Sequence, residues 1–563
     1  MNALLEGLTD RQAEAVTTTG APLCILAGAG SGKTRVLTRR IAYRVATGSA
    51  DPRHVLALTF TRKAATELGR RLEALGVRTH VTAGTFHALA YAQLRRWWAD
   101  NDRRPPVLLE RKVGLLARLH ASSGASVSGR ANVQPVDLAA EIEWAKARMV
   151  GPDDYEAAAA RHRRSAPLSP AALASLYRRY EVEKQRRGLV DFDDLLIGFA
   201  RAMVTDAEFA ASQRWRFRHL FVDEFQDVNP VQATLLAGWR GEGNDLCVVG
   251  DCNQAIYSWN GADPAQLRDF KRREPGATVV VLDDNFRSTP QILAVAGSLI
   301  PPGPGRSGRL RPRRPDGPLP CIRTFERDVD EARSIARLVR DRHAPGTPWS
   351  QIAVLTRTNA QLVAFEEAFR AGGIPVRVRG GGAFLERPEV KAALGELGRP
   401  DGALGPGLAD MAAAVRQGSP ELGTAAEERR AVLEELVRLG HDYLALEAEA
   451  SVAGFTAWLA AGLRSEAPHA VTDAVDLATF HAAKGLEWPV VFIAGLERGL
   501  VPISHATTDE ARDEERRLLY VAVTRAEREL HCSWARQRTF GARSLRRQAS
   551  PWLEEIQVAR AAL

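Results

Sequence analysis

Cysteine is scarce in this sequence: there are five in 563 residues, and no two of them form a C-x-x-C pair. That scarcity argues against a disulfide framework, a zinc site or an iron–sulfur cluster, and it fits a reducing cytoplasm. No apolar run reaches the ~18 residues that spanning a bilayer requires. Residues 1–10 have neither the basic nor the apolar region of an export signal. We therefore expect a cytoplasmic protein with no membrane partner.

Charge of one sign is only moderately in excess, with 76 lysines and arginines against 68 aspartates and glutamates and a formal net charge of +8. A basic balance favours a polyanionic partner, although the arginine codons of a GC-rich genome explain the same excess. The pair Arg95-Arg96 adjoins Trp97-Trp98, and cations beside stacking aromatics suit single-stranded nucleic acid. A solvated face explains the arginines equally well, and we expect the two tryptophans to lie in a helical core.

A phosphate-binding loop is the most informative feature that is present. Residues 27–34 read AGAGSGKT and lie between the apolar run 22–26 and a helical pattern. This matches G-x-x-x-x-G-K-[ST] with Ala27 at the first glycine position. In such a loop the backbone N–H groups cradle a polyphosphate, Lys33 reaches the β- and γ-phosphates, and the Thr34 hydroxyl ligates Mg²⁺. A glycine-rich turn with a chance Lys-Thr is the alternative, but the flanking strand and helix favour a nucleoside triphosphate site.

An acidic pair supplies the second half of such a site. The apolar run at residues 219–222 ends in Asp223-Glu224. Asp223 would hold Mg²⁺ through water, and Glu224 would polarise the attacking water. Many strands end in acidic residues, so this signal is weak alone and strong beside the P-loop.

The spacing of these two motifs shows how the chain is organised. They are separated by far more chain than the ~30 residues of one βαβ unit, and residues 93–189 between them are helix-rich. A second α/β pattern begins near Val279, and residues 391–470 are again rich in helix-forming residues. Apolar runs predict buried strands of this second pattern at 279–282, 351–355 and 490–495.

These observations predict an α/β protein of two domains, each interrupted by a mainly helical insert. A nucleotide at the junction of two such domains can drive a hinge motion. The first domain is expected at 1–92 and 190–283 with its insert at 93–189, and the second at 284–390 and 471–563 with a short insert at 391–470.

From residue 8 to residue 528 the chain resembles the UvrD/Rep/PcrA group of superfamily 1 DNA helicases. The resemblance implies two RecA-like P-loop-type domains with parallel sheets, the use of ATP and Mg²⁺, and 3′-to-5′ movement. The group's motifs are matched in order at residues 8–12, 27–34, 59–65, 84–88, 191–196, 222–227, 250–261, 285–289, 352–361, 376–381, 479–487 and 519–526.

The resemblance assigns residues to the nucleotide. Gln12 reads adenine, Phe286 stacks on it, Gln254 senses the γ-phosphate, and Arg287 and Arg525 are arginine fingers. The implied catalytic residues are Lys33, Asp223, Glu224, Gln254, Arg287 and Arg525, with Thr34 and Asp223 at the metal. The implied ATP-binding residues are Gln12, Ala27, Gly28, Ala29, Gly30, Ser31, Gly32, Lys33, Thr34, Arg35, Phe286, Arg287, Glu487 and Arg525.

The resemblance also assigns residues to single-stranded DNA. Each assigned residue has a structural alternative: the arginines could form ion pairs, the aromatic residues could pack in a core, and the histidines could cap a helix. The implied DNA-binding residues are Phe60, Arg62, Lys63, Thr85, Phe86, His87, Tyr257, Trp259, Arg357, His481 and Lys484.

The chain departs from the group at several points. Asn260 replaces an arginine that contacts DNA, and Phe286 replaces a tyrosine, which keeps the stacking ring but loses the hydroxyl. Residues 141–146 and 502–506 are most similar to the second UvrD paralogue of actinobacteria. The tetracysteine element and C-terminal helical domain of that paralogue are missing from this sequence, and the second insert is short.

The expected function is an ATP-dependent DNA helicase that acts on single strands and on junctions with duplex, in DNA repair or replication, and that is a monomer in isolation. Partners among repair or replication proteins are expected. The alternatives are a translocase that displaces proteins with little unwinding, and a nucleotide-switched DNA-binding module. An intact set of ATPase residues argues against the latter.

Overall fold

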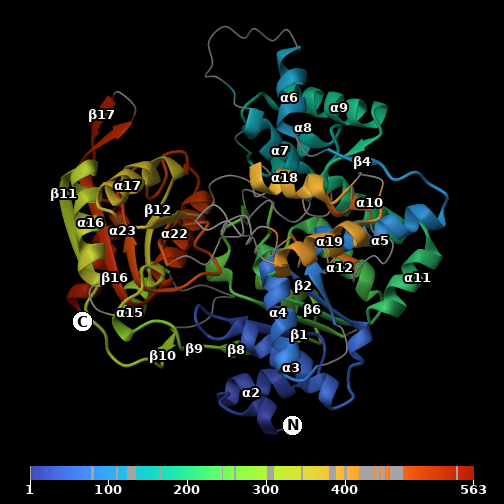
Figure 1. Cartoon of the computed structure of the whole chain (residues 1–563), viewed down its shortest axis with the longest axis horizontal. Coiled ribbons are helices and arrows are strands. Elements are labelled where there is room, and N and C mark those ends of the chain that lie inside the picture. Colours follow the sequence, from blue (N-terminus) through green and yellow to red (C-terminus); the bar gives the residue numbers. More distant parts are fainter. Residues whose placement is uncertain are drawn as a thin grey trace.

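The structure of the chain is a computed structural model. It describes residues 2–77, 81–109, 112–122, 133, 135–164, 166–243, 245–258, 261–300, 310–343, 346–379, 388–398, 402–417, 473–540 and 543–563, together with scattered residues between 433 and 456. Figure 1 shows the two α/β domains side by side, with further helices above them.

Six parallel strands form the sheet of the first domain, in the order β3-β2-β6-β7-β1-β8. Most of their residues are buried, as expected where helices cover both faces of a parallel sheet, and the exposed ones, Thr278 and Val281, lie in the edge strand β8. The strands are β1 (Leu23–Ala27), β2 (Val55–Thr59), β3 (Thr82–Thr85), β6 (His219–Val222), β7 (Leu246–Gly250) and β8 (Thr278–Leu282).

Strand β8 corrects one sequence prediction. Residues 279–282 do not open the second α/β unit but pair in parallel with β1 at the edge of the first sheet. An apolar run predicts a buried strand, but it carries no information about which sheet receives that strand.

Helices cover both faces of this sheet. One face packs against α2 (Asp10–Thr17), α3 (Lys33–Ala46) and α4 (Arg62–Ala74). The other packs against α5 (Phe86–Asp100), α10 (Phe192–Thr205), α11 (Ala207–Arg216) and α12 (Pro230–Arg240). Shorter helices of this domain are α1 (Asn2–Leu5), α13 (Ala265–Arg268) and α14 (Phe270–Arg273).

The second sheet is built in the same way, in the order β11-β16-β15-β12-β14-β13, with one antiparallel strand, β17, paired to β16. Its strands are β11 (Cys321–Arg327), β12 (Ile352–Thr356), β13 (Val376–Val378), β14 (Val475–Thr479), β15 (Trp488–Ile493), β16 (Ala526–Phe540) and β17 (Arg543–Arg546). Strands β12 and β15 confirm the other two predicted strands.

Helices also cover both faces of the second sheet. One face carries α16 (Asp328–His343) and α17 (Asn359–Ala371). The other carries α15 (Pro290–Ser298), α22 (Asp509–Val523) and α23 (Pro551–Ala561). The short pair β9 (Asp284–Asn285) and β10 (Arg311–Pro312) lies in the connection between the two sheets.

The first insert has a hydrophobic core of its own, formed by α6 (Lys112–Ala121), α7 (Pro135–Ala147), α8 (Tyr155–Arg161) and α9 (Pro170–Arg186). Figure 1 shows these helices together at the top of the molecule. The chain leaves and re-enters the first domain through the parallel pair β4 (Val107–Leu108) and β5 (Leu189–Val190). Helix α5 (Phe86–Asp100) continues past residue 92, where the sequence analysis ended the first segment of the first domain. The insert therefore begins after this helix, which packs in the first domain.

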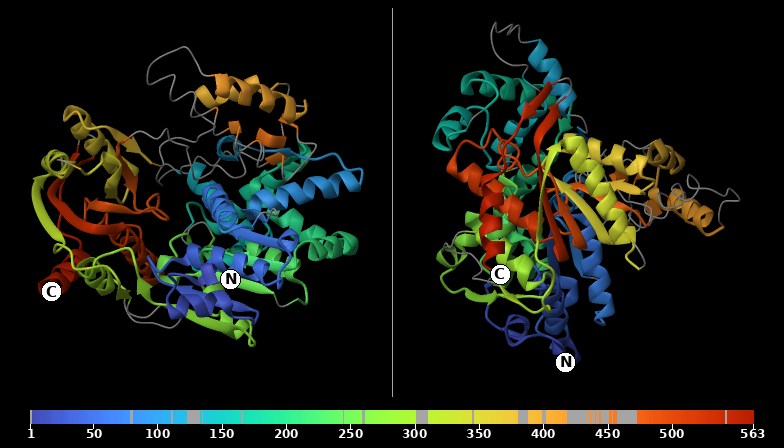
Figure 2. Two further views of the ribbon diagram at one scale, coloured as in Figure 1. Left: turned by 60° about the horizontal axis from the view of Figure 1, so that its bottom comes forward. Right: turned by 90° about the vertical axis from the view of Figure 1, so that its left-hand side faces the viewer.

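Only part of the second insert lies within the described residues, namely α18 (Pro388–Glu396), α19 (Leu404–Gln417) and a few residues beyond them. Leu404 and Leu408 join the hydrophobic cluster of the first domain, and Arg95 of α5 donates a 2.8 Å hydrogen bond to the Tyr443 hydroxyl. In the left view of Figure 2 these orange helices lie over the first domain.

Trp97 and Trp98 pack against the core of the first domain, which confirms the expectation of a helical core. The Trp97 indole donates to Asp206 at 2.7 Å. None of the helices in the described part of the chain has the length and apolarity that crossing a bilayer demands.

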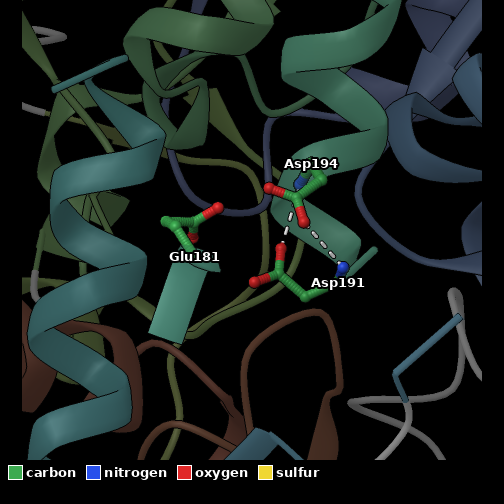
Figure 3. Close-up of side chains that lie close together, drawn as sticks. All are labelled: Glu181, Asp191 and Asp194. Atoms are coloured by element: carbon green, nitrogen blue, oxygen red, sulfur yellow. Dashed lines mark hydrogen bonds between the residues drawn. The ribbon is translucent and has the colours of Figure 1, made fainter. Parts of the chain in front are cut away.

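A buried charge cluster ties the first insert to its domain. The carboxylates of Glu181, Asp191 and Asp194 lie close together, as Figure 3 shows. The Lys146 ammonium lies 2.8, 2.7 and 2.5 Å from them in that order, and Lys184 also pairs with all three. Burial favours the neutral acid at Asp191, but the neighbouring lysines outweigh burial and hold its pKa well below the usual range. Because two ammonium groups fill the space among these oxygens, we assign the cluster a structural role.

This cluster predicts a large stability effect for one lysine. Lys146→Ala removes a buried cation from three carboxylates and should destabilise the native state by about 3–5 kcal/mol. Thermal and denaturant unfolding would measure it. Lys271→Ala, at an exposed lysine of the same domain, should change stability by no more than about 0.5 kcal/mol. Equal effects of the two substitutions would contradict a structural role for the cluster.

Candidate functional site

The topology of the first sheet brings the ATPase motifs to one edge. Strands β6, β7 and β1 are consecutive neighbours and parallel, so the segments that follow them meet at their carboxyl ends. The P-loop follows β1, Asp223 follows β6, and Asp251 follows β7. A crevice at the carboxyl ends of parallel strands is where open α/β sheets bind ligands.

The P-loop has the backbone shape that its sequence predicts. Gly30 and Gly32 adopt φ values of +66° and +82°, a region that residues with a Cβ rarely enter. Helix α3 begins at Lys33, two residues earlier than the helical pattern indicated. The loop therefore leads directly into a helix N-terminus, where backbone N–H groups favour an anion.

The acidic pair lies against the end of the P-loop. The Lys33 ammonium is 3.2 Å from the Glu224 carboxylate, and the Thr34 hydroxyl donates to Asp223 at 3.4 Å. Burial and the neighbouring Glu224 raise the pKa of Asp223. Burial also acts to raise the pKa of Glu224, but Lys33 and Lys484 outweigh it and lower that pKa.

Glu224 also has an unusual backbone. Its φ of +50° and ψ of +42° place it in the left-handed region, which costs a non-glycine residue of order 1–3 kcal/mol. Such strain persists where the surroundings fix the residue, and here a hydrogen bond from its backbone N–H to the Asp223 carboxylate, 2.9 Å long, does so.

The hydroxyl of Thr34 and the carboxylate of Asp223 are hard oxygen donors, the kind that Mg²⁺ prefers. The two groups contact each other directly and lie beside the P-loop, where a triphosphate would supply further oxygens. The residues present therefore fit a magnesium ion.

Two residues that the sequence analysis did not assign connect the acidic pair to the neighbouring strand. Gln226 donates to the Glu224 carboxylate and accepts a 2.9 Å hydrogen bond from the backbone N–H of Asp251. The Asp251 carboxylate in turn accepts from the Gln254 side chain at 2.7 Å. A Cβ on Gly250 would lie 2.6 Å from the Gln226 side-chain oxygen, so a larger residue there would displace the Gln226 amide from these contacts. The signal available in the sequence was a repeat: each of the two apolar strands is followed by an aspartate with a glutamine three residues later, Asp223 with Gln226 and Asp251 with Gln254.

The two arginines predicted as fingers, Arg287 and Arg525, lie near each other, and Arg287 lies directly beside Gly30 of the P-loop. The Arg287 guanidinium pairs with Glu487 at 2.6 Å and donates to the Thr524 carbonyl at 3.3 Å. Arg525 is buried and donates to the carbonyls of Val521 and Leu486. Burial, reinforced by Arg287, lowers the pKa of Arg525 to about 9.

The residues predicted to contact the adenine base differ in how exposed they are. Phe286 is 39% exposed, which leaves its ring accessible. The Gln12 side chain is buried, donates to the Ser31 carbonyl at 2.9 Å and closes a capping box with Thr9. Arg35 is exposed and donates to the Gly7 carbonyl. Gln12 therefore lies against the P-loop, with its amide engaged by the protein itself.

Three predicted DNA-binding residues form a group where segments of the two domains meet. The Tyr257 ring lies 6.4 Å from the His481 ring, and the Lys484 ammonium lies 4.8 Å from the Tyr257 ring centre. Burial, reinforced by Arg357 and Lys484, lowers the pKa of His481 to about 4. Lys484 also forms an ion pair with the buried Asp227, which no sequence signal indicated.

Other predicted DNA-binding residues follow β2, β3 and β12. Lys63 is exposed and Phe60 is partly buried, whereas Phe86 is buried among core aromatics, 6.5 Å from the Trp239 ring. Arg357 is held by the Glu515 carboxylate at 2.9 Å. Phe86 and Arg357 are thus engaged within the protein in this structure.

Four more predicted positions complete this set. Thr85 caps α5 by accepting a hydrogen bond from the Ala88 N–H. Arg62 is buried and His87 is partly buried. Trp259 lies outside the described residues, as does Asn260, so the contacts expected there remain predictions.

Comparison with known proteins bears on the whole chain. Residues 8–275 match the family described as UvrD/REP helicase N-terminal domain, and residues 280–398 and 408–537 match the UvrD-like helicase C-terminal domain. The chain is 43% identical over 579 aligned positions to the ATP-dependent DNA helicase UvrD2 of Mycobacterium tuberculosis, covering 97% of this chain and 81% of that protein.

Two further relatives are similar over nearly the full chain. The ATP-dependent DNA helicase PcrA of Bacillus subtilis is 30% identical, with 99% of this chain and 86% of that protein covered. The ATP-dependent DNA helicase UvrD1 of Mycobacterium tuberculosis is 32% identical, with 98% and 85% covered. Together with the P-loop and the acidic pair at one sheet edge and the two arginines near them, these matches show that the chain belongs to the UvrD/Rep family of ATP-dependent DNA helicases.

Proposed function

We propose that this chain moves 3′ to 5′ along single-stranded DNA by hydrolysing ATP and unwinds duplex at single-strand junctions, in DNA repair or replication. One observation carries the ATP-driven part of this proposal. The P-loop of the first domain touches the segment that leads into the second, where the Phe286 N–H donates to the Gly30 carbonyl at 2.9 Å. A nucleotide on the P-loop would therefore meet groups of both domains.

We assign each residue at the P-loop a part in hydrolysis. Lys33 and the P-loop N–H groups hold the phosphates, and Glu224 orients the attacking water and accepts its proton. Magnesium, held through Thr34 and Asp223, supplies further neutralisation of phosphate charge. Arg287 and Arg525 stabilise the charge that develops on the γ-phosphate, a contribution that in related chemistry is worth about 10³–10⁵ in rate.

Ion pairs and hydrogen bonds between the two domains support coupling of hydrolysis to DNA movement. Lys484, after β14, donates to the Gln254 carbonyl at 2.8 Å as well as pairing with Asp227. Arg517 of α22 donates to the Ala255 carbonyl at 2.8 Å. The segment that contains Gln254 also contains Tyr257, so a change at the γ-phosphate would move a group proposed to contact DNA.

The first test removes the P-loop lysine. Lys33→Ala should lower ATP hydrolysis at least about 100-fold, because the phosphates lose their principal cation. Binding of labelled single-stranded DNA should stay within about 3-fold of the unmodified protein. Hydrolysis assays and fluorescence anisotropy would measure the two effects. Loss of both together would mean that the P-loop is structural.

The second test concerns direction and duplex unwinding. Duplexes with a 3′ tail, a 5′ tail or blunt ends would be incubated with the protein and ATP, beside streptavidin displacement from biotinylated single strands. We expect unwinding of the 3′-tailed substrate alone. A requirement for a 5′ tail would refute the proposed polarity, and displacement without unwinding would indicate a translocase.

The third test separates coupling from DNA contact at Lys484. Because Lys484 pairs with Asp227 inside the protein, Lys484→Ala should lower DNA-stimulated hydrolysis about 10-fold and leave single-strand affinity within about 2-fold. Lys63→Ala, at an exposed lysine, should instead weaken single-strand binding. It should also reduce, by about one, the slope of the logarithm of DNA affinity against the logarithm of salt concentration. If the two variants lose affinity and salt slope equally, Lys484 contacts DNA and the coupling role is wrong.

A further inference from the structure

The chain leaves the first sheet beside the P-loop. Strand β8 is the neighbour of β1 and runs parallel to it, so β8 ends at the same edge as the P-loop strand. The residues that follow, Asp284 to Ser288, therefore pass along the P-loop on their way to the second domain. Asn285 is the second residue of short strand β9 in this passage.

The Asn285 side chain uses both ends of its amide. It is fully buried, and its Nδ2 donates to the Ala29 carbonyl of the P-loop at 2.6 Å. Its Oδ1 accepts from the backbone N–H groups of Arg287 at 3.0 Å and Ser288 at 2.8 Å. Asparagine is suited to this position because one group must donate while the other accepts twice.

The approach of this segment to the P-loop is close. A Cβ placed on Gly30 would lie 2.5 Å from the Asn285 Nδ2 and 2.7 Å from the Arg287 Cβ. Gly30 is therefore fixed by steric contact with this segment as well as by its positive φ. A shift of the P-loop at Ala29 or Gly30 would act directly on the segment that carries Arg287.

The far side of the segment is anchored in the second domain. The Ser288 hydroxyl donates to the Ala526 carbonyl at 2.6 Å, and the Thr289 N–H donates to the Glu527 carbonyl at 3.0 Å. The Asn285 amide thus stands between the P-loop on one side and a backbone fixed to β16 on the other.

We propose that Asn285 is a positioning residue, whose amide couples the Ala29 carbonyl to the backbone N–H of Arg287 and thereby fixes the arginine relative to the phosphates. This inference rests on the proposed function of Arg287 as an arginine finger. Asn285 itself holds no phosphate; it acts through Arg287.

A double-mutant cycle tests this role. Asn285→Ala should lower kcat about 10-fold, the size expected for loss of a buried hydrogen bond, with ADP affinity within about 3-fold. Arg287→Ala should lower kcat about 10³-fold. If Asn285 acts through Arg287, the double variant should be within about 2-fold of Arg287→Ala, because no positioned group remains to lose.

A matched control addresses stability. Asn229→Ala removes the N-terminal capping box that Asn229 and Gln232 form at α12 in the same domain. It should destabilise the protein without lowering kcat. Should Asn285→Ala fail to fold, Asn285→Ser keeps a small uncharged polar side chain that is too short to join Ala29 to the Arg287 N–H, and the same cycle applies.

The outcomes separate the two proposals. If Arg287→Ala leaves kcat unchanged, the finger assignment itself is wrong. If Arg287→Ala lowers kcat and the double variant falls to the product of the single effects, about 10⁴-fold, Asn285 acts independently and the inference is overturned. An equal loss of kcat in Asn285→Ala and Asn229→Ala would also overturn it, because stability alone would then explain the effect.

Discussion

The parallel pairing of β1 with β7 on one side and β8 on the other determines the arrangement of the site. A parallel sheet places the carboxyl ends of its strands at one edge. The P-loop is therefore flanked by Asp251 after β7 and by Asn285 after β8, and the next strand, β6, brings Asp223 and Glu224. Every proposed catalytic contact of the first domain, and the route into the second, follows from this strand order.

The charged groups at this edge satisfy one another within the protein. Lys33 pairs with Glu224, Arg287 pairs with Glu487, and Lys484 pairs with Asp227. Of these three pairs, Lys484–Asp227 joins the two domains, and there each buried charge is compensated by its partner. A change at the P-loop edge can therefore act through Asp227 and Lys484 on Tyr257, a residue that we propose contacts DNA.

The two buried ionic clusters share one electrostatic pattern, so their place in the fold distinguishes the roles that we assign to them. Around Asp191, lysines outweigh burial and complete a network that includes the capping box of α10. At the acidic pair, burial and Glu224 raise the pKa of Asp223, while Lys33 and Lys484 outweigh burial and lower that of Glu224. In the first cluster, burial and Asp191 raise the pKa of Asp194 in the same way. Perturbed carboxyl groups beside a phosphate-binding loop are typical of catalytic sites. Because the first cluster lies among the helices of the insert and the second lies beside the P-loop, we assign stability to the first and propose catalysis for the second.

The sequence alone was sufficient to predict the P-loop, the acidic pair, the strands at 351–355 and 490–495, and the helical character of the first insert, because these depend on local spacing and apolar patterns. It also placed the chain in its helicase group. Tertiary structure decided what each side chain touches. Asn285 and Ala29 are 256 positions apart, and Lys484 and Asp227 are 257 apart. Local patterns also could not show that β8 pairs directly with β1, that Phe86 is buried in the core, or that the Gln12 amide is engaged by Ser31. Contacts between distant segments arise only when the sheets assemble, so no pattern in the sequence specifies them.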